Sequence, residues 1–283
     1  MARRLLALAA ALAPLAVLCP SAQAIVGGKP APPGKYPFFA VLEVDDRFSC
    51  GASLVAPDTV LTAAHCVTED DDSVTKASRL SFVIGRDRLS DTSKGEDIPA
   101  AEVIRHEDFD SSTFENDVAL VRLSRPSTAP TIRLADPATE RDRWAPRKPA
   151  TVIGHGGTFF PGIGGVNTTD DLHEVQVPMV SDQQCDTTVG IDETSMVCAG
   201  NDLGGADSCN GDSGGPLMVT DAAGAFIQVG TVSFGTGCGF PTQYGVYGRV
   251  GDSKLHDWVT ARIAAPAPAP SSSGSAGGAA AEP

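Results

Sequence analysis

The sequence predicts an all-β domain that ends in one helix. Between residues 36 and 250, short runs rich in β-branched and aromatic residues alternate with Gly, Pro, Asp and Asn. This punctuation is typical of a β-sandwich or barrel, whereas βαβ units would place a helical pattern between strands. Examples of the expected strands are residues 38–42, 80–84, 117–123, 150–154, 226–230 and 245–247.

The one helical pattern follows the last of these strands. Leu255, Trp258, Val259 and Ile263 recur at spacings that place them on one helix face. Asp252 or Ser253 can serve as the N-cap, so the sequence predicts a helix over residues 253–264.

Residues 1–24 have the pattern of a secretory signal peptide. Arg3 and Arg4 precede an uncharged apolar run over residues 5–18, and Ala22-Gln23-Ala24 forms an A-x-A cleavage signal. The alternative is a buried core helix. The apolar run is too short for a comfortable membrane span, so we expect a secreted, extracellular protein with no membrane partner.

Composition sets the limits of the rest of the chain. The 283 residues include 21 Lys and Arg against 35 Asp and Glu, a formal charge of −14, which argues against nucleic acid as a partner. Residues 265–283 contain only Ala, Pro, Ser, Gly and one Glu, and we expect a disordered tail there. The folded domain is therefore expected over residues 25–264.

Three segments carry residues suited to nucleophilic catalysis. They are residues 61–66 (LTAAHC), 116–120 (NDVAL) and 211–216 (GDSGGP). A serine hydroxyl needs an adjacent base, histidine titrates near neutral pH, and a buried carboxylate can orient the imidazole. The backbone N–H groups of Gly211 and Ser213 are candidate donors to an oxyanion. Each segment alone could be a turn or part of the core, but together they predict catalytic residues His65, Asp117 and Ser213.

These segments, with Ile25-Val26-Gly27-Gly28, resemble the chymotrypsin/trypsin family of serine endopeptidases over residues 25–264. The Ala-rich, single-domain style looks like a bacterial secreted member. The resemblance implies two six-stranded antiparallel β-barrels with a short C-terminal helix, and a site in the cleft between them. It also implies a Ser-His-Asp acyl-enzyme mechanism without cofactor or metal, and polypeptide substrates of a monomeric enzyme.

The resemblance also assigns a substrate pocket. Asp207 matches the position at the base of the primary pocket, followed by Ser208. Gly235 and Gly245 match its walls, and residues 233–235, which include Ser233 and Phe234, are expected to pair with the substrate backbone. A buried carboxylate favours a cationic side chain, so we expect cleavage after Arg or Lys. The alternative is that Asp207 is only a loop acid.

Cysteines and the N-terminus give two further expectations. Of seven cysteines, Cys19 lies in the predicted signal peptide, and spacing alone does not choose among the pairings of the other six. The sequence contains no CxxC or HxxxH string, so its spacing gives no support for a zinc site. The resemblance implies the pairs Cys50–Cys66, Cys185–Cys198 and Cys209–Cys238.

In the family, the amine of the first residue of IVGG pairs with the carboxylate before the nucleophile, which corresponds here to Ile25 and Asp212. Because the A-x-A signal ends directly before Ile25, we expect signal peptidase itself to release that amine.

The alternative function is a catalytically silent family member that acts as a binding or adhesion module.

Overall fold

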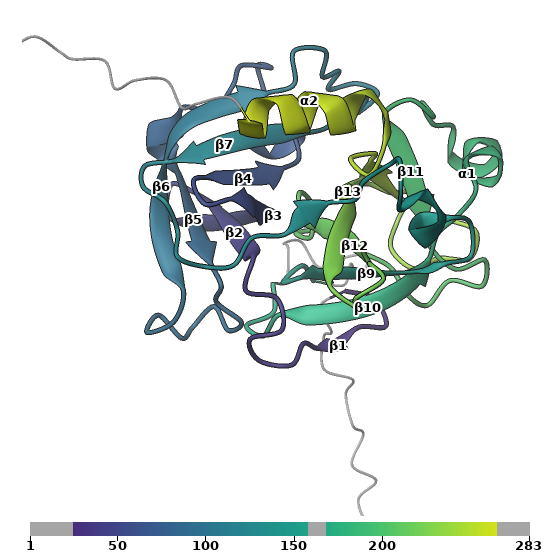
Figure 1. The fold of residues 1–283 in the computed structure, drawn as a ribbon, viewed down its shortest axis with the longest axis horizontal. Helices are drawn as coiled ribbons and strands as arrows, with labels where there is room; N and C mark the ends of the chain where they lie inside the picture. Colours follow the sequence, from purple (N-terminus) through teal and green to yellow (C-terminus); the bar gives the residue numbers. More distant parts are fainter. Residues whose placement is uncertain (1–24, 158–167, 265–283) are drawn as a thin grey trace, which may run out of the picture.

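The computed structural model describes residues 25–157 and 168–264. The predicted signal peptide and tail lie outside these residues. Figure 1 shows two β-structures side by side, the first built mainly from the purple and blue part of the chain and the second mainly from the green part.

The first β-structure is a closed six-stranded antiparallel barrel, as the resemblance implied. Its strands follow the order β2-β3-β4-β7-β6-β5 around the barrel. Large apolar side chains fill its interior, and Leu42, Leu54, Phe82 and Leu120 are fully buried. The strands are β2 (Phe39–Val44), β3 (Arg47–Ala56), β4 (Thr59–Thr62), β5 (Leu80–Ile84), β6 (Glu96–Arg105) and β7 (Ala119–Leu123).

The second β-structure is an eight-stranded sheet in which six longer strands follow the order β10-β9-β12-β13-β14-β11. An isolated antiparallel bridge between Met179 and Ala199 links the two ends of this order, so the sheet curls into the second barrel. Two further strands have two residues each. β1 pairs with β10 in the antiparallel direction, and β8 pairs with β13 in the parallel direction. The strands are β1 (Lys29–Pro30), β8 (Arg133–Leu134), β9 (Pro149–Gly154), β10 (His173–Pro178), β11 (Met196–Ala199), β12 (Pro216–Thr220), β13 (Phe226–Phe234) and β14 (Gly245–Gly248).

The C-terminal helix α2 (Ser253–Ala264) has the bounds that the sequence predicts. It crosses back to the first barrel in Figure 1, where Leu255, Trp258 and Val259 join the buried core. The sequence analysis did not predict α1 (Asp182–Val189), which begins after Ser181, whose hydroxyl accepts a hydrogen bond from the Gln184 N–H. In the described part of the chain there are also three short 3₁₀ helices: η1 (His65–Val67), η2 (Ala77–Arg79) and η3 (Arg141–Trp144).

Strand register brings distant segments to one edge of each barrel. In the first, Thr62 at the end of β4 pairs with Ala119 at the start of β7, so the residues just after β4 meet those just before β7. In the second, Pro216 at the start of β12 pairs with Thr231 near the end of β13. The Gly51 N–H donates to the Ser213 carbonyl at 2.7 Å and so joins the two edges directly.

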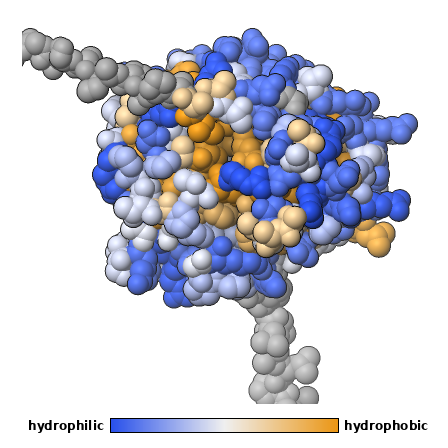
Figure 2. All heavy atoms as spheres, viewed as in Figure 1, coloured by the Kyte–Doolittle hydropathy of each residue, from blue (hydrophilic) through white to orange (hydrophobic). Residues whose placement is uncertain are grey.

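The surface in the view of Figure 2 is mostly hydrophilic at its margin, with hydrophobic residues visible towards its middle. Among the described residues, no helix is long and apolar enough to cross a membrane.

Candidate active site

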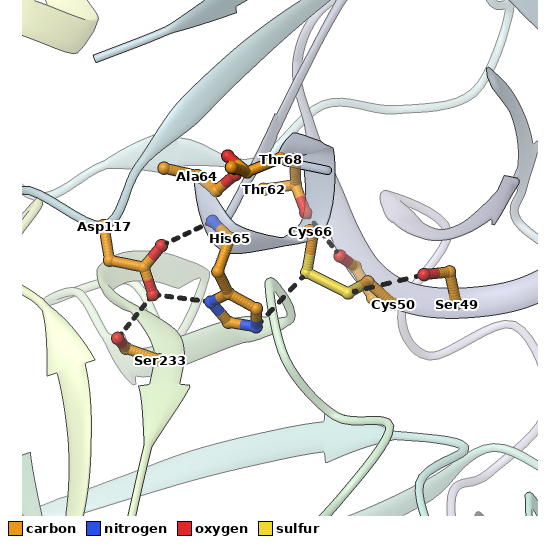
Figure 3. The surroundings of a disulfide bond; sticks show 10 residues. Ser49, Cys50, Thr62, Ala64, His65, Cys66, Thr68, Asp117 and Ser233 are labelled. Carbon is orange, nitrogen blue, oxygen red and sulfur yellow. Dashed lines mark hydrogen bonds and ion pairs between the residues drawn. A yellow bond between two sulfur atoms is a disulfide. The ribbon is translucent and has the colours of Figure 1, made fainter. Parts of the chain in front are cut away.

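His65 and Asp117 form a close pair at the edge where β4 and β7 meet (Figure 3). The His65 Nδ1 lies 2.7 Å from Asp117 Oδ2, and the His65 backbone N–H donates to Asp117 Oδ1 at 2.9 Å. The Ser233 hydroxyl, from the second barrel, donates to Asp117 Oδ2 at 2.5 Å. The Asp117 carboxylate thus accepts three hydrogen bonds, one of them from His65 Nδ1. Because Nδ1 is bonded to Asp117, Nε2 is the ring nitrogen that remains to accept a proton.

The environment of His65 makes it a stronger base than an ordinary histidine. Burial acts to lower the pKa of His65, but the negative charge of Asp117 and its hydrogen bond to the ring outweigh burial and raise that pKa. Such a base remains partly exposed, with a side chain 25% accessible, and so is open to a substrate proton.

A disulfide fixes the short turn that carries His65. Cys66 follows His65 in η1 and is bonded to Cys50 in the middle of β3. The Thr68 hydroxyl donates to the Ala64 carbonyl at 2.8 Å and closes the other end of the turn. The His65 ring therefore starts from a backbone that cannot shift easily relative to the barrel.

Ser213 lies in the turn before β12, and two glycines shape this turn. Gly211 has φ +94° and Gly214 has φ +78°, which L side chains rarely adopt. A Cβ on Gly214 would lie 2.2 Å from Thr62 Oγ1, so the second barrel can approach the first only with glycine there. Among residues 25–157 and 168–264, neither the Gly211 N–H nor the Ser213 N–H donates to another group. These are the two donors that the sequence analysis assigned to an oxyanion.

Ser213 and His65 line one pocket of about 400 Å³, together with Cys50 and Cys66, which form a disulfide. The His65 Nε2 lies 3.6 Å from Cys66 Sγ, and in the described part of the chain it makes no hydrogen bond with the Ser213 hydroxyl. Such bonds are often long in a free enzyme and shorten when substrate binds.

A second pocket, of about 280 Å³, is also lined by Ser213 and includes Asp207. Asp207 is 2% exposed; its Oδ2 accepts from the Gly239 N–H at 2.9 Å, whereas its Oδ1 has no hydrogen-bond partner among the described residues. Burial raises the pKa of Asp207 to about 7. Burial of a charged carboxylate with an unpaired oxygen is unfavourable, and a cation beside it would stabilise the charge.

This pocket contains all six substrate-binding residues that the sequence analysis named: Asp207, Ser208, Ser233, Phe234, Gly235 and Gly245. The Cys209–Cys238 disulfide joins two of its walls. Gly245 lies against the base, because a Cβ there would be 2.9 Å from Asp207 Oδ1. The third disulfide, Cys185–Cys198, ties α1 to β11 away from the pocket.

Asp212 is also buried, but it faces the protein. Its Oδ1 accepts from the Gly156 N–H at 2.9 Å and its Oδ2 from the Cys209 N–H at 2.8 Å. Burial raises the pKa of Asp212 to about 7. Ile25 is fully buried nearby, and its nitrogen donates to the Gly156 carbonyl at 3.1 Å. In the full-length chain this nitrogen belongs to a peptide bond with Ala24, and the ion pair between Ile25 and Asp212 stays a prediction.

A metal ion has no suitable ligand set near the pair. Within the described ranges, one group of three His, Cys, Asp or Glu side chains is close enough to hold an ion: Cys50, His65 and Cys66. Both sulfurs of this group are joined in a disulfide and offer no thiolate, so these residues do not fit a metal site.

Several residues of the site were missed by the sequence analysis. Asn210 and Gly237 line the Asp207 pocket, and Phe114 packs against the His65 ring with centroids 5.5 Å apart. The Gly-Thr-Gly-Cys-Gly string around Gly237 signals a turn but not a pocket wall. No local pattern distinguishes Phe114 from any other loop aromatic.

Comparison with known proteins agrees with this geometry. The family model described as Trypsin matches residues 25–259. Trypsin-1 of Astacus astacus is 38% identical over 244 residues, which cover 84% of this chain and 99% of that protein. Serine protease 56 of Homo sapiens and of Mus musculus are each 34% identical over 85% of this chain, which spans only 39% of their length. These relatives are animal proteins, so a bacterial origin stays a prediction. The chain belongs to the trypsin family of serine proteases.

Proposed function

We propose that the chain is a secreted endopeptidase that hydrolyses peptide bonds after Arg or Lys. The observation that carries this specificity is the free Oδ1 of Asp207, buried at the base of a pocket that opens beside Ser213. A guanidinium or ammonium group would supply the missing partner, whereas an apolar side chain would leave the carboxylate unpaired at a cost of about 1–3 kcal/mol or more.

The catalytic steps assign one role to each group. His65 Nε2 removes the Ser213 hydroxyl proton as Ser213 Oγ attacks the substrate carbonyl, and the carbonyl oxygen becomes an oxyanion. The Gly211 and Ser213 N–H groups donate to that oxyanion. His65 then gives its proton to the leaving amine, and an acyl-enzyme ester remains on Ser213. Water hydrolyses this ester by the same steps in reverse order, with Asp117 stabilising the imidazolium each time.

The end of β13, beside the Asp207 pocket, supports a substrate that binds as an added strand. Ser233, Phe234 and Gly235 lie at the end of β13 and just beyond it, on the wall of the Asp207 pocket. An extended peptide paired with this segment would place its basic side chain in the pocket and its next peptide bond at Ser213.

For the chain outside the catalytic groups, we propose that residues 1–24 are a signal peptide and that cleavage after Ala24 frees the Ile25 amine. Support comes from the burial of Ile25 and from Gly156, which contacts both the Ile25 nitrogen and the Asp212 carboxylate. A new amine there would be drawn to the buried carboxylate. Residues 25–264 then form a monomeric catalytic domain followed by the tail 265–283, and Edman sequencing of the secreted protein tests the cleavage site.

The function is tested with fluorogenic peptides that differ only in Arg, Lys, Phe or Leu before the scissile bond. The mature protein is expected to hydrolyse the Arg and Lys peptides, and Ser213→Ala to hydrolyse none. Rapid cleavage after Phe or Leu with Arg peptides ignored would overturn the specificity. Equal rates for the protein and Ser213→Ala, or none for either, would favour the silent binding module instead.

A further inference from the structure

Glu174 is a buried carboxylate that belongs neither to the catalytic pair nor to the Asp207 pocket. It lies on β10 of the second barrel and is 7% exposed. Its Oε2 accepts hydrogen bonds from Lys35 Nζ and from the Tyr36 hydroxyl, each at 2.6 Å, and Lys29 Nζ lies 3.6 Å from its Oε1. Burial of a carboxylate is unfavourable unless it is paired, and this one takes all three partners from a single part of the chain.

The three partners lie in residues 29–36, which join the N-terminus to the first barrel. Lys29 begins β1, which lies beside β10 in Figure 1, and it is paired with Glu174 in the antiparallel ladder. Lys35 and Tyr36 are at the other end, just before β2. Because β1 has only two residues, its ladder alone is a weak attachment. Glu174 therefore joins both ends of this stretch to the second barrel.

Aromatic rings cover this cluster of charges. The Tyr36 ring is buried, and its centroid lies 5.1 Å from that of Phe226. Lys35 Nζ lies 5.0 Å from the Tyr36 centroid and 5.7 Å from the Phe226 centroid. Burial acts to raise the pKa of Glu174, but the hydrogen bonds from Lys35 and Tyr36 outweigh it and lower that pKa. Glu174 is therefore ionised at neutral pH, and its attraction to Lys35 is screened less than that of a surface pair.

The residues just before this stretch reach Asp212. Ile25 is fully buried, and its nitrogen donates to the Gly156 carbonyl at 3.1 Å. The Gly156 N–H in turn donates to Asp212 Oδ1 at 2.9 Å. Only residues 26–28 separate Ile25 from Lys29, a connection too short to absorb a large movement. A movement of Lys29 away from β10 would therefore displace Ile25 as well.

We propose that Glu174 is a positioning residue for the Ile25 amine: it keeps residues 29–36 on the second barrel and so increases the fraction of molecules in which that amine lies beside Asp212. The inference rests on the proposed function, in which cleavage after Ala24 frees the amine. The N-terminus then has an inserted state and a released state, and the inserted state is the active one. Because Glu174 is paired with residues 29–36 only when they lie on β10, loss of this pairing favours the released state.

The equilibrium between the two states gives the proposal a direction in pH. The inserted amine keeps its proton, whereas the released amine loses it with an ordinary pKa of about 8. When the inserted state predominates at neutral pH, activity is lost on the alkaline side at a pH set by the ratio of inserted to released molecules. Each tenfold fall in that ratio moves this alkaline limb about one unit to lower pH.

The other titratable groups around Ile25 do not change charge in this limb. Burial raises the pKa of Asp212 and that of Asp207 to about 7, so both carboxyls are ionised above that pH. Burial also raises the pKa of Tyr247, which stays neutral, and lowers the pKa of His155 to about 4, so that its ring is neutral too. The alkaline limb therefore reports on the Ile25 amine.

The test compares Glu174→Gln and Tyr36→Phe with Glu140→Gln as a matched control. Tyr36→Phe removes one hydroxyl that donates to Glu174 and keeps the buried ring. Glu140 is a second carboxylate paired with a basic side chain, at 2.7 Å from Arg133, and this pair lies outside residues 25–36.

Two quantities are measured on the secreted protein. The dependence of kcat/KM on pH for an Arg peptide gives the alkaline limb. The rate at which acetic anhydride acetylates the Ile25 amine, followed by mass spectrometry, gives the released fraction without any need for catalysis, because a buried amine is protected from the reagent. A merely structural role of Glu174 would lower the melting temperature and leave both quantities unchanged.

Glu174→Gln is expected to move the alkaline limb to lower pH by about half a unit to one unit and to speed acetylation of Ile25 by about three- to tenfold. Tyr36→Phe should change both quantities in the same directions by less, because the Lys35 ammonium still pairs with the carboxylate. Glu140→Gln should change neither quantity, even if its melting temperature falls.

An alkaline limb and an acetylation rate that are unchanged in both Glu174→Gln and Tyr36→Phe, or changed equally in Glu140→Gln, would overturn the proposal. If Glu174→Gln does not fold, Tyr36→Phe decides by the same criteria. A wild-type Ile25 amine that is acetylated as fast as the free dipeptide Ile-Val would refute the proposed pair with Asp212 itself. The failure of the proposed function and that of the role of Glu174 are therefore distinguishable.

Discussion

Asp207 and Asp212 lie five positions apart and share nearly the same burial, yet their surroundings differ in one respect. Each carboxyl has a pKa raised to about 7 because it is buried. Backbone N–H groups satisfy both oxygens of Asp212, whereas Asp207 keeps Oδ1 free towards a cavity. The first arrangement is satisfied within the protein, and the second leaves an oxygen for the ligand that we propose. Burial and pKa alone would not separate them.

The largest effect is expected from Asp207→Asn. A neutral amide cannot balance a buried cation, so transition-state binding of Arg peptides should weaken by about 3–5 kcal/mol, which lowers kcat/KM by about 150-fold to about 5,000-fold. The rate at which a small neutral fluorophosphonate labels Ser213 should stay within about threefold of the wild type, because Ser213 and His65 are unchanged. Steady-state kinetics and labelling rates measured side by side check this, and an equal loss in both would contradict a purely recognising role.

Gly154→Ala is expected to break the Asp212 side of the comparison. A Cβ on Gly154 would lie 2.0 Å from Asp212 Oδ1 and 2.9 Å from its Cγ, and this buried carboxylate is held in place by the Gly156 and Cys209 N–H groups. Overpacking of this kind should cost about 3 kcal/mol of unfolding free energy, with activity lost for every substrate. Gly190→Ala is the comparison: nothing lies within 4 Å of its Cβ, but its φ of +76° strains an L residue, so it should cost only about 1–2 kcal/mol. Urea unfolding measures both, and a Gly154→Ala protein as stable as Gly190→Ala would show that the cradle can relax.

Asp212→Asn sharpens the comparison with a smaller change. One oxygen becomes an NH₂ group that faces a backbone N–H, so a hydrogen bond is lost inside the protein at about 1–3 kcal/mol. Peptide hydrolysis and fluorophosphonate labelling should decline together, in contrast to Asp207→Asn. A selective loss of Arg peptides alone would mean that Asp212 also contributes to recognition.

The raised pKa of Asp207 predicts a pH-dependent affinity for cations. Benzamidine binds the ionised carboxylate, so its affinity should fall as pH drops below about 7, by about tenfold per unit well below that value. Isothermal titration at several pH values measures this in the protein and in Asp207→Asn, whose weak binding should not share the dependence. Constant affinity between pH 5 and 8 would mean that the free pocket already holds an ionised Asp207.

The last effect, which develops only in acid, concerns His155, which lies between Gly154 and Gly156 beside Asp212. Burial lowers the pKa of His155 to about 4 from the ordinary 6.5. The unfolded chain therefore binds a proton that the folded protein refuses, and stability is lost as pH falls from about 6.5 to about 4. Relative to His155→Phe, the unfolding free energy of the protein should therefore decrease as pH falls through this window. A difference that is constant with pH would show that His155 is protonated in the fold.

Local pattern was sufficient for much of the fold. Leu80–Ile84 and the α2 helix were bounded correctly because strong apolar periodicity coincided with turn and cap residues. α1 was missed because its residues are polar on nearly every side, although Ser181 and Gln184 match a capping pattern. Helix α1 depends on its cap and on the Cys185–Cys198 bond rather than on an apolar stripe.

The site divides in the same way. Motifs located the residues of the pocket and the His65–Asp117 pair, since short strings of sequence carry them. The free oxygen of Asp207 and the approach of Phe114 to His65 depend on segments far apart in the chain, and no single string contains them. Tertiary contacts alone decide which loop aromatic meets the imidazole.

The bond from the Gly51 N–H to the Ser213 carbonyl has a mechanical consequence. It joins one barrel to the other at Ser213, the proposed nucleophile, and the Ser233 hydroxyl joins them again at Asp117. A force that pulls the halves apart would therefore act on Ser213 and Asp117, together with the Ser53–Gln228 hydrogen bond between β3 and β13. In a single-molecule stretching experiment, peptide hydrolysis should stop at a lower force than the force that unfolds either barrel.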